Sequence, residues 1–179
     1  VKTKKFFSLK SSVVGENYKN KINRIRKILK SNKADYILIS APENVAWTLN
    51  IRGSDNPNSP IPNCRLIIGK NKETFLITEK QKASEIIKEG KISNKQIVSP
   101  NKFRDLIGKL KGKKFIIDHL SCSVLNEKII QSKFKIINKD DPCYKLKSIK
   151  NSSEIKHMIN AHVEDGLAVT KFIFWIKNI

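Results

Sequence analysis

The sequence predicts an α/β protein: a three-layer sandwich in which helices cover a mixed sheet of about six strands. Six short apolar runs alternate with segments whose apolar residues recur at helical spacing, and this alternation is typical of that class. The length of 179 residues suits one domain of ordinary size, and 39% hydrophobic with 29% charged residues is a globular composition. We therefore expect one compact unit that folds around a core.

Each predicted strand is a short run rich in residues that suit strands. The runs cover residues 35–40, 64–69, 73–78, 96–99, 114–118 and 134–138. The second and third are separated by a connection of hairpin length, so we expect these two strands to pair antiparallel. Helical patterns predict helices over residues 17–30, after Pro42, over 80–89, 103–110 and 124–131, and from Asn151 onward.

The last helix differs from the others because its second half lacks a polar face. Asn151 followed by Glu154 resembles a capping box that begins a helix, and residues 167–176 are apolar on nearly all sides. Such a helix expects burial from every direction. The chain ends at Ile179 within this element, and it begins with Val1 where an intact protein usually carries methionine. We therefore expect a piece of a longer protein.

Residues 50–63, NIRGSDNPNSPIPN, form the segment least compatible with a helix or a strand pairing, because they contain three prolines, a glycine and several turn-forming residues. A loop this long inside a compact domain is usually functional or disordered, and the prolines favour a stiffened loop. Arg52 lies between a short helix, in which we expect Trp47 to be buried, and a glycine. We expect its guanidinium to face a carboxylate, either Asp55 within the loop or a ligand.

The net charge of +20 points, taken alone, to nucleic acid or an anionic membrane surface. The type of cation argues otherwise, because 31 of the 36 basic residues are lysine and specific phosphate or base recognition favours arginine. The lysines are also spread along the chain. We attribute the charge to a biased composition and expect neither a specific nucleic-acid partner nor membrane binding.

The sequence gives weak signals for a metal site or a catalytic constellation. The three cysteines are far apart and form no C-x-x-C pair, which favours a reducing compartment. Glu154 and His157 have the spacing of a di-metal motif, but such a site needs ligands from three further helices. His162 with Asp165 is explained equally well by a hydrogen bond along one helix. Asp118 ends a predicted strand, where both functional and turn-forming aspartates occur.

The chain resembles a known family in two long stretches. Residues 35–68, DYILISAPENVAWTLNIRGSDNPNSPIPNCRLII, with ETFLI at 73–77, are similar to the second N-terminal domain of three-domain Xaa-Pro aminopeptidases, in the creatinase/prolidase superfamily. Residues 140–176, DDPCYKLKSIKNSSEIKHMINAHVEDGLAVTKFIFWI, resemble the junction with the catalytic "pita-bread" domain. The resemblance implies a connector over 1–16, the N-terminal-type domain over 17–141, a linker over 142–150 and the first catalytic-domain helix over 151–179.

The resemblance implies a ribonuclease H-like topology and a parent enzyme that removes an N-terminal residue from peptides whose second residue is proline. That chemistry uses two divalent ions, commonly manganese, held by two Asp, one His and two Glu of the catalytic domain. All five ligands are expected beyond Ile179. This chain is therefore expected to hold no catalytic residue, metal ligand or cofactor of its own, and the parent is expected in the cytoplasm.

In relatives, N-terminal domains cover the catalytic cleft of their own or a neighbouring subunit and support dimers. The resemblance therefore makes the loop residues Arg52, Gly53, Ser54 and Asp55 candidates for a contact with the substrate or the dimer partner. The implied partners are the chain's own catalytic domain, a second copy, and proline-containing peptides through the parent. Two alternatives stay open: a free-standing basic nucleic-acid-binding protein, and a stand-alone module that binds peptides or partners without hydrolysis.

Overall fold

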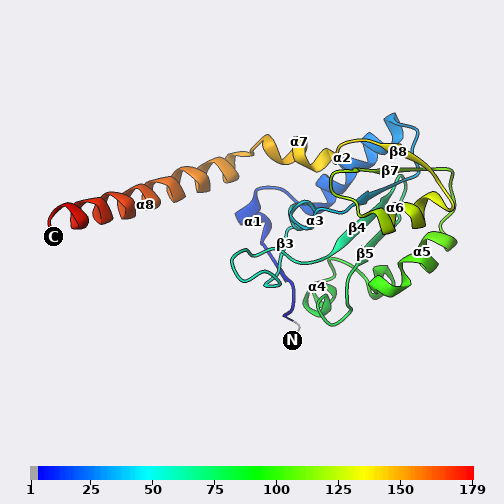
Figure 1. The fold of residues 1–179 in the computed structure, drawn as a ribbon, viewed down its shortest axis with the longest axis horizontal. Coiled ribbons are helices and arrows are strands. Elements are labelled where there is room, and N and C mark those ends of the chain that lie inside the picture. Colours follow the sequence, from blue (N-terminus) through cyan, green and yellow to red (C-terminus); the bar gives the residue numbers. More distant parts are fainter. Residues whose placement is uncertain (1–3) are drawn as a thin grey trace.

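The computed structural model describes residues 4–179 and contains a six-stranded sheet with the strand order β6-β5-β4-β2-β7-β8 (Figure 1). The strands are β2 (Tyr36–Ile39), β4 (Arg65–Gly69), β5 (Thr74–Ile77), β6 (Ile97–Val98), β7 (Lys114–Ile117) and β8 (Lys135–Asn138). Each coincides with a predicted strand. The expectation drawn from Val1 lies outside the described residues.

The sheet is mixed, as predicted. Strand β4 pairs antiparallel with both β2 and β5, and the β4–β5 hairpin sets Leu66 opposite Leu76. The pairs β2–β7, β7–β8 and β5–β6 are parallel. A parallel connection needs a crossover, and the segments that supply these crossovers contain the predicted helices.

Helices cover both faces of the sheet. Neighbouring residues of one strand point to opposite faces, so both faces carry apolar side chains that the helices bury. In β2, Ile37 and Ile39 belong to one buried cluster, whereas Tyr36 and Leu38 belong to another. The first cluster includes residues of α2 (Tyr18–Ser31), α3 (Pro42–Leu49), α4 (Ser84–Lys88) and α7 (Pro142–Ser148). The second includes residues of α5 (Phe103–Lys109) and α6 (Val124–Gln131). The arrangement is the three-layer sandwich that the alternating pattern predicts.

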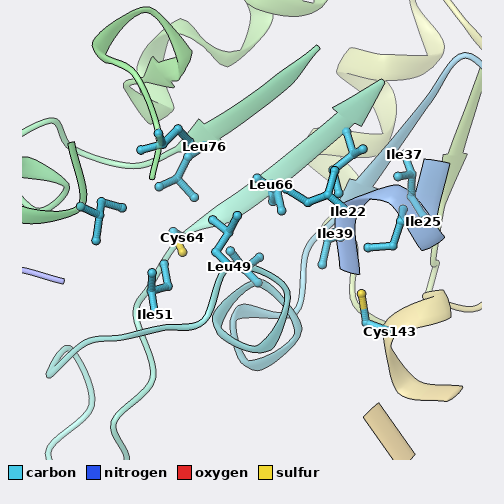
Figure 2. Close-up of a cluster of buried hydrophobic side chains, with 14 of the residues drawn as sticks. Ile22, Ile25, Ile37, Ile39, Leu49, Ile51, Cys64, Leu66, Leu76 and Cys143 are labelled. Carbon is cyan, nitrogen blue, oxygen red and sulfur yellow. The ribbon is translucent and has the colours of Figure 1, made fainter. Parts of the chain in front are cut away.

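The first cluster forms the larger part of the core (Figure 2). Ile22, Ile25 and Leu29 follow one another at helical spacing along α2 and are buried against the sheet. Asn17 caps this helix by accepting a hydrogen bond from the Lys19 amide at 2.9 Å. The aliphatic stripe that predicts the helix is therefore also the surface that fixes it to the sheet.

Aromatic side chains define the second cluster. The ring centroids of Tyr36, Phe115 and Phe134 lie 5.3 to 5.8 Å apart, and two of the three pairs meet edge to face. All three rings are buried, and the Tyr36 hydroxyl donates to the Lys111 carbonyl at 3.0 Å. The aromatic rings on this face of the sheet are therefore buried, and the Tyr36 hydroxyl has a hydrogen-bond partner.

Two segments expected as connectors are packed parts of the domain. Residues 4–16 contain β1 (Phe7–Ser8) and α1 (Ser11–Val14), and Phe6 is completely buried in the first cluster. Residues 142–150 contain α7, whose Cys143 is also completely buried. The sequence does not indicate that these two segments are packed, because each contains short elements with only one or two apolar residues in the core.

Helix α8 (Ser152–Lys177) leaves the domain as a long rod whose far end contacts nothing else (Figure 1). The predicted capping box is present, with Asn151 and Glu154 each accepting the backbone amide of the other. Asn151 also donates to the Val14 carbonyl at 2.9 Å, which fixes the base of the helix to the module. From Ile155 onward every side chain is exposed, including Phe172 and Trp175. Across residues 4–179, no helix is both long enough and apolar enough to cross a membrane.

Candidate functional site

The candidate loop begins where α3 ends, at a residue with a left-handed backbone. Asn50 has φ 52° and ψ 47°, a conformation that asparagine tolerates better than most side chains. Its amide nitrogen donates to the Glu16 carbonyl at 2.7 Å, and its oxygen accepts from the Lys21 ammonium at 2.7 Å. Both contacts tie the start of the loop to the beginning of α2.

The first loop residues form a strand, which corrects the expectation that no strand pairing is tolerated here. Strand β3 (Ile51–Arg52) pairs antiparallel with β1, placing Arg52 opposite Phe7. The prolines lie further along, from Pro57 onward, and do not interrupt this short pairing. Gly53 follows, where an added Cβ would lie 2.8 Å from the Pro62 Cα, so the two limbs of the loop approach too closely for a side chain.

The predicted pair between Arg52 and Asp55 does not form. Asp55 accepts from the Lys82 ammonium at 2.6 Å and from the Asn63 amide at 2.7 Å, and so pins both limbs of the loop to the segment before α4. The Arg52 guanidinium donates to the Ile51 carbonyl at 2.9 Å, and no carboxylate of residues 4–179 lies within 4 Å of it. Of the two alternatives for Arg52, the pair with Asp55 is excluded because Lys82, distant in sequence, binds the Asp55 carboxylate, and the alternative of a ligand stays a prediction.

The four candidate residues therefore do not form one site. Arg52 faces a cleft at the base of α8, Gly53 is buried between the loop limbs, Ser54 is exposed, and Asp55 is paired with Lys82. Of the two charged members, Asp55 is paired with Lys82, whereas Arg52 has no carboxylate partner among residues 4–179.

The cleft between the module and α8, called here the α8 cleft, has a volume of about 430 Å³. The module contributes Leu9, Val13, Lys21, Trp47, Asn50 and Arg52, and α8 with the residues before it contributes Lys150, Glu154, His157 and Met158. Figure 1 shows that β3, α1 and the first turns of α8 lie on the same side of the domain. Residues more than 100 positions apart in sequence thus share one cavity.

Lys21 is the most unusual side chain of the α8 cleft, because it is a lysine with only 1% of its surface exposed. Its ammonium donates to Asn50 Oδ1 and to the Trp47 carbonyl at 3.0 Å, and it lies 4.3 Å from the centroid of the Trp47 ring. Burial lowers the pKa of Lys21 from 10.5 to about 8, opposed by the charges of Glu154 and Glu16. Burial likewise lowers the pKa of Arg52.

Sequence reasoning missed Lys21 and Asn50 and expected Trp47 to be more buried than it is. Lys21 could have been noticed, because it lies four residues before Ile25 and eight before Leu29, on the apolar stripe of α2. Asn50 carried a weaker signal, as an asparagine directly after a helix. Nothing in the sequence indicates that the two side chains meet.

The other sequence candidates show no catalytic grouping. Asp118 is buried and accepts from the Leu120 amide at 2.9 Å and from the Ser121 hydroxyl at 3.2 Å, which is a turn-forming role. His162 and Asp165 are exposed on α8. Among residues 4–179, no three His, Cys, Asp or Glu side chains gather in a way that would hold a metal ion.

The domain is an α/β sandwich with a mixed six-stranded sheet, followed by a projecting helix. Comparison with known proteins identifies the family to which it belongs. The family model of the Creatinase/Prolidase N-terminal domain matches residues 1–154. The chain therefore belongs to the creatinase/prolidase N-terminal domain family.

The chain is similar to Xaa-Pro aminopeptidase 1 of Dictyostelium discoideum, with 31% identity over 174 residues, covering 96% of this chain and 27% of that protein. It is also similar to Xaa-Pro aminopeptidase ApepP of Drosophila melanogaster, with 30% identity over 179 residues, covering 97% of this chain and 29% of that protein. The chain thus spans less than a third of the length of either relative and corresponds to a domain found in Xaa-Pro aminopeptidases.

Solved structures agree with the fold. The X-prolyl aminopeptidase from Caenorhabditis elegans, described as a cytosolic enzyme with a di-nuclear active site, superposes with a TM-score of 0.81 at 21% identity. The match covers 97% of this chain and 29% of that one. The Xaa-Pro dipeptidase from Bacillus anthracis superposes with a TM-score of 0.59 at 19% identity, covering 86% of this chain and 44% of that one.

Proposed function

We propose that this chain is a non-catalytic accessory domain of a cytoplasmic Xaa-Pro aminopeptidase. In this proposal the parent hydrolyses the bond between an N-terminal residue and a following proline. Two divalent metal ions, with manganese as the expected metal, would polarise the scissile carbonyl and activate water in the catalytic domain that the resemblance implies. Because the resemblance places the metal ligands in that domain, we assign no side chain of residues 4–179 to the chemical step.

One observation supports the role of the loop: Arg52 and the first turns of α8 line the same cleft. The resemblance implies that α8 is the first helix of the catalytic domain. In this proposal, a side chain that lines the cleft therefore lies next to the start of the catalytic domain. The Asp55–Lys82 pair and the close approach at Gly53 hold the loop in place. A fixed loop beside the junction is suited to cover the catalytic cleft or to support a dimer.

The catalytic part of the proposal is tested by comparing this chain with the longer parent protein. Both are purified and assayed with X-Pro peptides in the presence of manganese, measuring release of the N-terminal residue. We expect turnover by the parent and none by the isolated chain. Manganese-dependent hydrolysis by the isolated chain would contradict the accessory role, and inactivity of a metal-loaded, folded parent would contradict the assignment of activity.

The role of the loop is tested in the parent by Arg52→Ala, with Arg104→Ala as the matched control on the exposed face of α5. Removing a charge-assisted contact costs on the order of 1.5 to 3 kcal/mol, which is roughly a 10- to 100-fold loss. We expect that loss in kcat/KM or in the dimerisation constant from sedimentation, and no change for Arg104→Ala. Unchanged kinetics and assembly in both variants would limit Arg52 to a structural role.

A further inference from the structure

Positively charged side chains outnumber carboxylates among the residues that line the α8 cleft. Three cations line it, Lys21, Arg52 and Lys150, against the single carboxylate of Glu154. Lys21 uses the oxygen of Asn50, and Glu154 already accepts the Asn151 amide. Glu16 also acts on Lys21 but is paired with Arg24, so positive charge stays in excess around the cleft.

Most donor groups of Arg52 are not used by the protein. The half-buried guanidinium carries five N–H groups but, among residues 4–179, donates only to the Ile51 carbonyl. The indole Nε1 of Trp47 is buried without any hydrogen-bond partner among the described residues. The remaining N–H groups of the partly exposed Arg52 can bind a ligand that brings acceptor atoms, whereas Trp47 Nε1 has almost no exposed surface and is not reached from the cleft.

The walls of the cleft determine what else the ligand must carry. Leu9, Val13 and Met158 provide apolar surface beside the cations, and the Trp47 ring provides an aromatic surface. The volume of about 430 Å³ falls in the range of small-molecule sites, which run from about 300 to 1,000 Å³. A bare inorganic anion would leave these walls uncovered, whereas a molecule with an apolar body would pack against them.

We propose that the α8 cleft binds a small amphipathic carboxylate, with its carboxylate on Arg52 and its apolar body against Trp47 and Met158. A guanidinium and a carboxylate match as planar partners that form two parallel hydrogen bonds, which favours a carboxylate as the anion. A short peptide with a free C-terminus has this chemistry. The choice of a peptide rests on the proposed function, but the carboxylate site rests on the cleft alone.

The test uses the 179-residue chain, labelled with ¹⁵N, and the tripeptide Ala-Pro-Leu as a free acid and as its C-terminal amide. The chain has two tryptophans, so the Trp47 indole signal reports on the cleft and the Trp175 indole, near the end of α8, serves as an internal reference. We expect the acid to shift the Trp47 signal in a saturable manner and the amide to bind at least tenfold more weakly. The Trp175 signal should stay in place.

Two variants and one control locate the site. Arg52→Gln should weaken binding of the acid at least tenfold, Lys150→Gln should weaken it severalfold, and Arg104→Gln should leave it unchanged. The ¹⁵N spectra of the free variants establish that each is folded, and the comparison of acid with amide on the unaltered chain needs no variant. Equal binding of acid and amide, or undiminished binding by folded Arg52→Gln, would overturn the proposal. Equally tight binding of inorganic phosphate would overturn the amphipathic ligand and leave only a general anion site.

Discussion

Replacing the buried Lys21 by methionine should change how the stability of the domain depends on pH. Burial lowers the folded-state pKa of Lys21 from 10.5 to about 8. Between these two pH values the unfolded chain holds more protons than the folded one, so this group makes stability rise with pH across that window. Below pH 8 the lysine is protonated in both states and contributes no pH dependence.

The size of the effect follows from the same two values. The interval from 10.5 to about 8 corresponds to roughly 3 kcal/mol at the conversion of 1.36 kcal/mol per pH unit. Lys21→Met removes this rise. At neutral pH the substitution changes the free energy of unfolding by less than this value. Removing the buried charge is favourable, but the hydrogen bonds to Asn50 and Trp47 are lost, each about 1.5 to 3 kcal/mol.

The assay is urea unfolding followed by circular dichroism between pH 7 and 10.5, carried out on the unaltered chain, Lys21→Met and the exposed-lysine control Lys128→Met. Other groups titrate in this range, including tyrosines whose pKa burial raises, so the quantity to compare is the difference between chains at each pH. We expect the control to follow the unaltered chain. If Lys21→Met also follows it, the buried-cation interpretation is wrong.

Three further predictions concern other parts of the molecule. The chain should self-associate through the apolar residues of α8, whereas a version ending at Lys150 should sediment as a monomer; equal behaviour of the two would refute this. Asp35, whose pKa is lowered to about 2 by hydrogen bonds from Lys70, Lys113 and Lys114 despite partial burial, stabilises the fold above its unfolded pKa of about 3.9. That contribution should disappear as the pH falls from 4 to 2, and Asp35→Asn should unfold with a weaker acid dependence. Any binding to DNA or RNA should be independent of sequence and lost steeply with salt, so sequence-selective binding at physiological salt would contradict our interpretation of the charge.

The local patterns in the sequence predicted most of the secondary structure. Apolar runs such as residues 35–40 and 114–118 indicate strands because both faces of a covered sheet are buried, and the stripe Ile22, Ile25 and Leu29 indicates a helix with one buried face. The capping box at Asn151 and Glu154 is likewise a local signal, since both partners lie within one turn. Each of these features depends on residues that are close neighbours in the chain.

The tertiary structure alone decided the site, because its contacts join residues that are distant in sequence. Asp55 pairs with Lys82 instead of Arg52, and this leaves the Arg52 guanidinium free beside α8. The buried ammonium of Lys21 donates to the Asn50 side chain, 29 residues later, and to the Trp47 carbonyl. Sequence spacing predicts periodic burial, but which charges end up paired depends on how the loop, α2 and α8 come together.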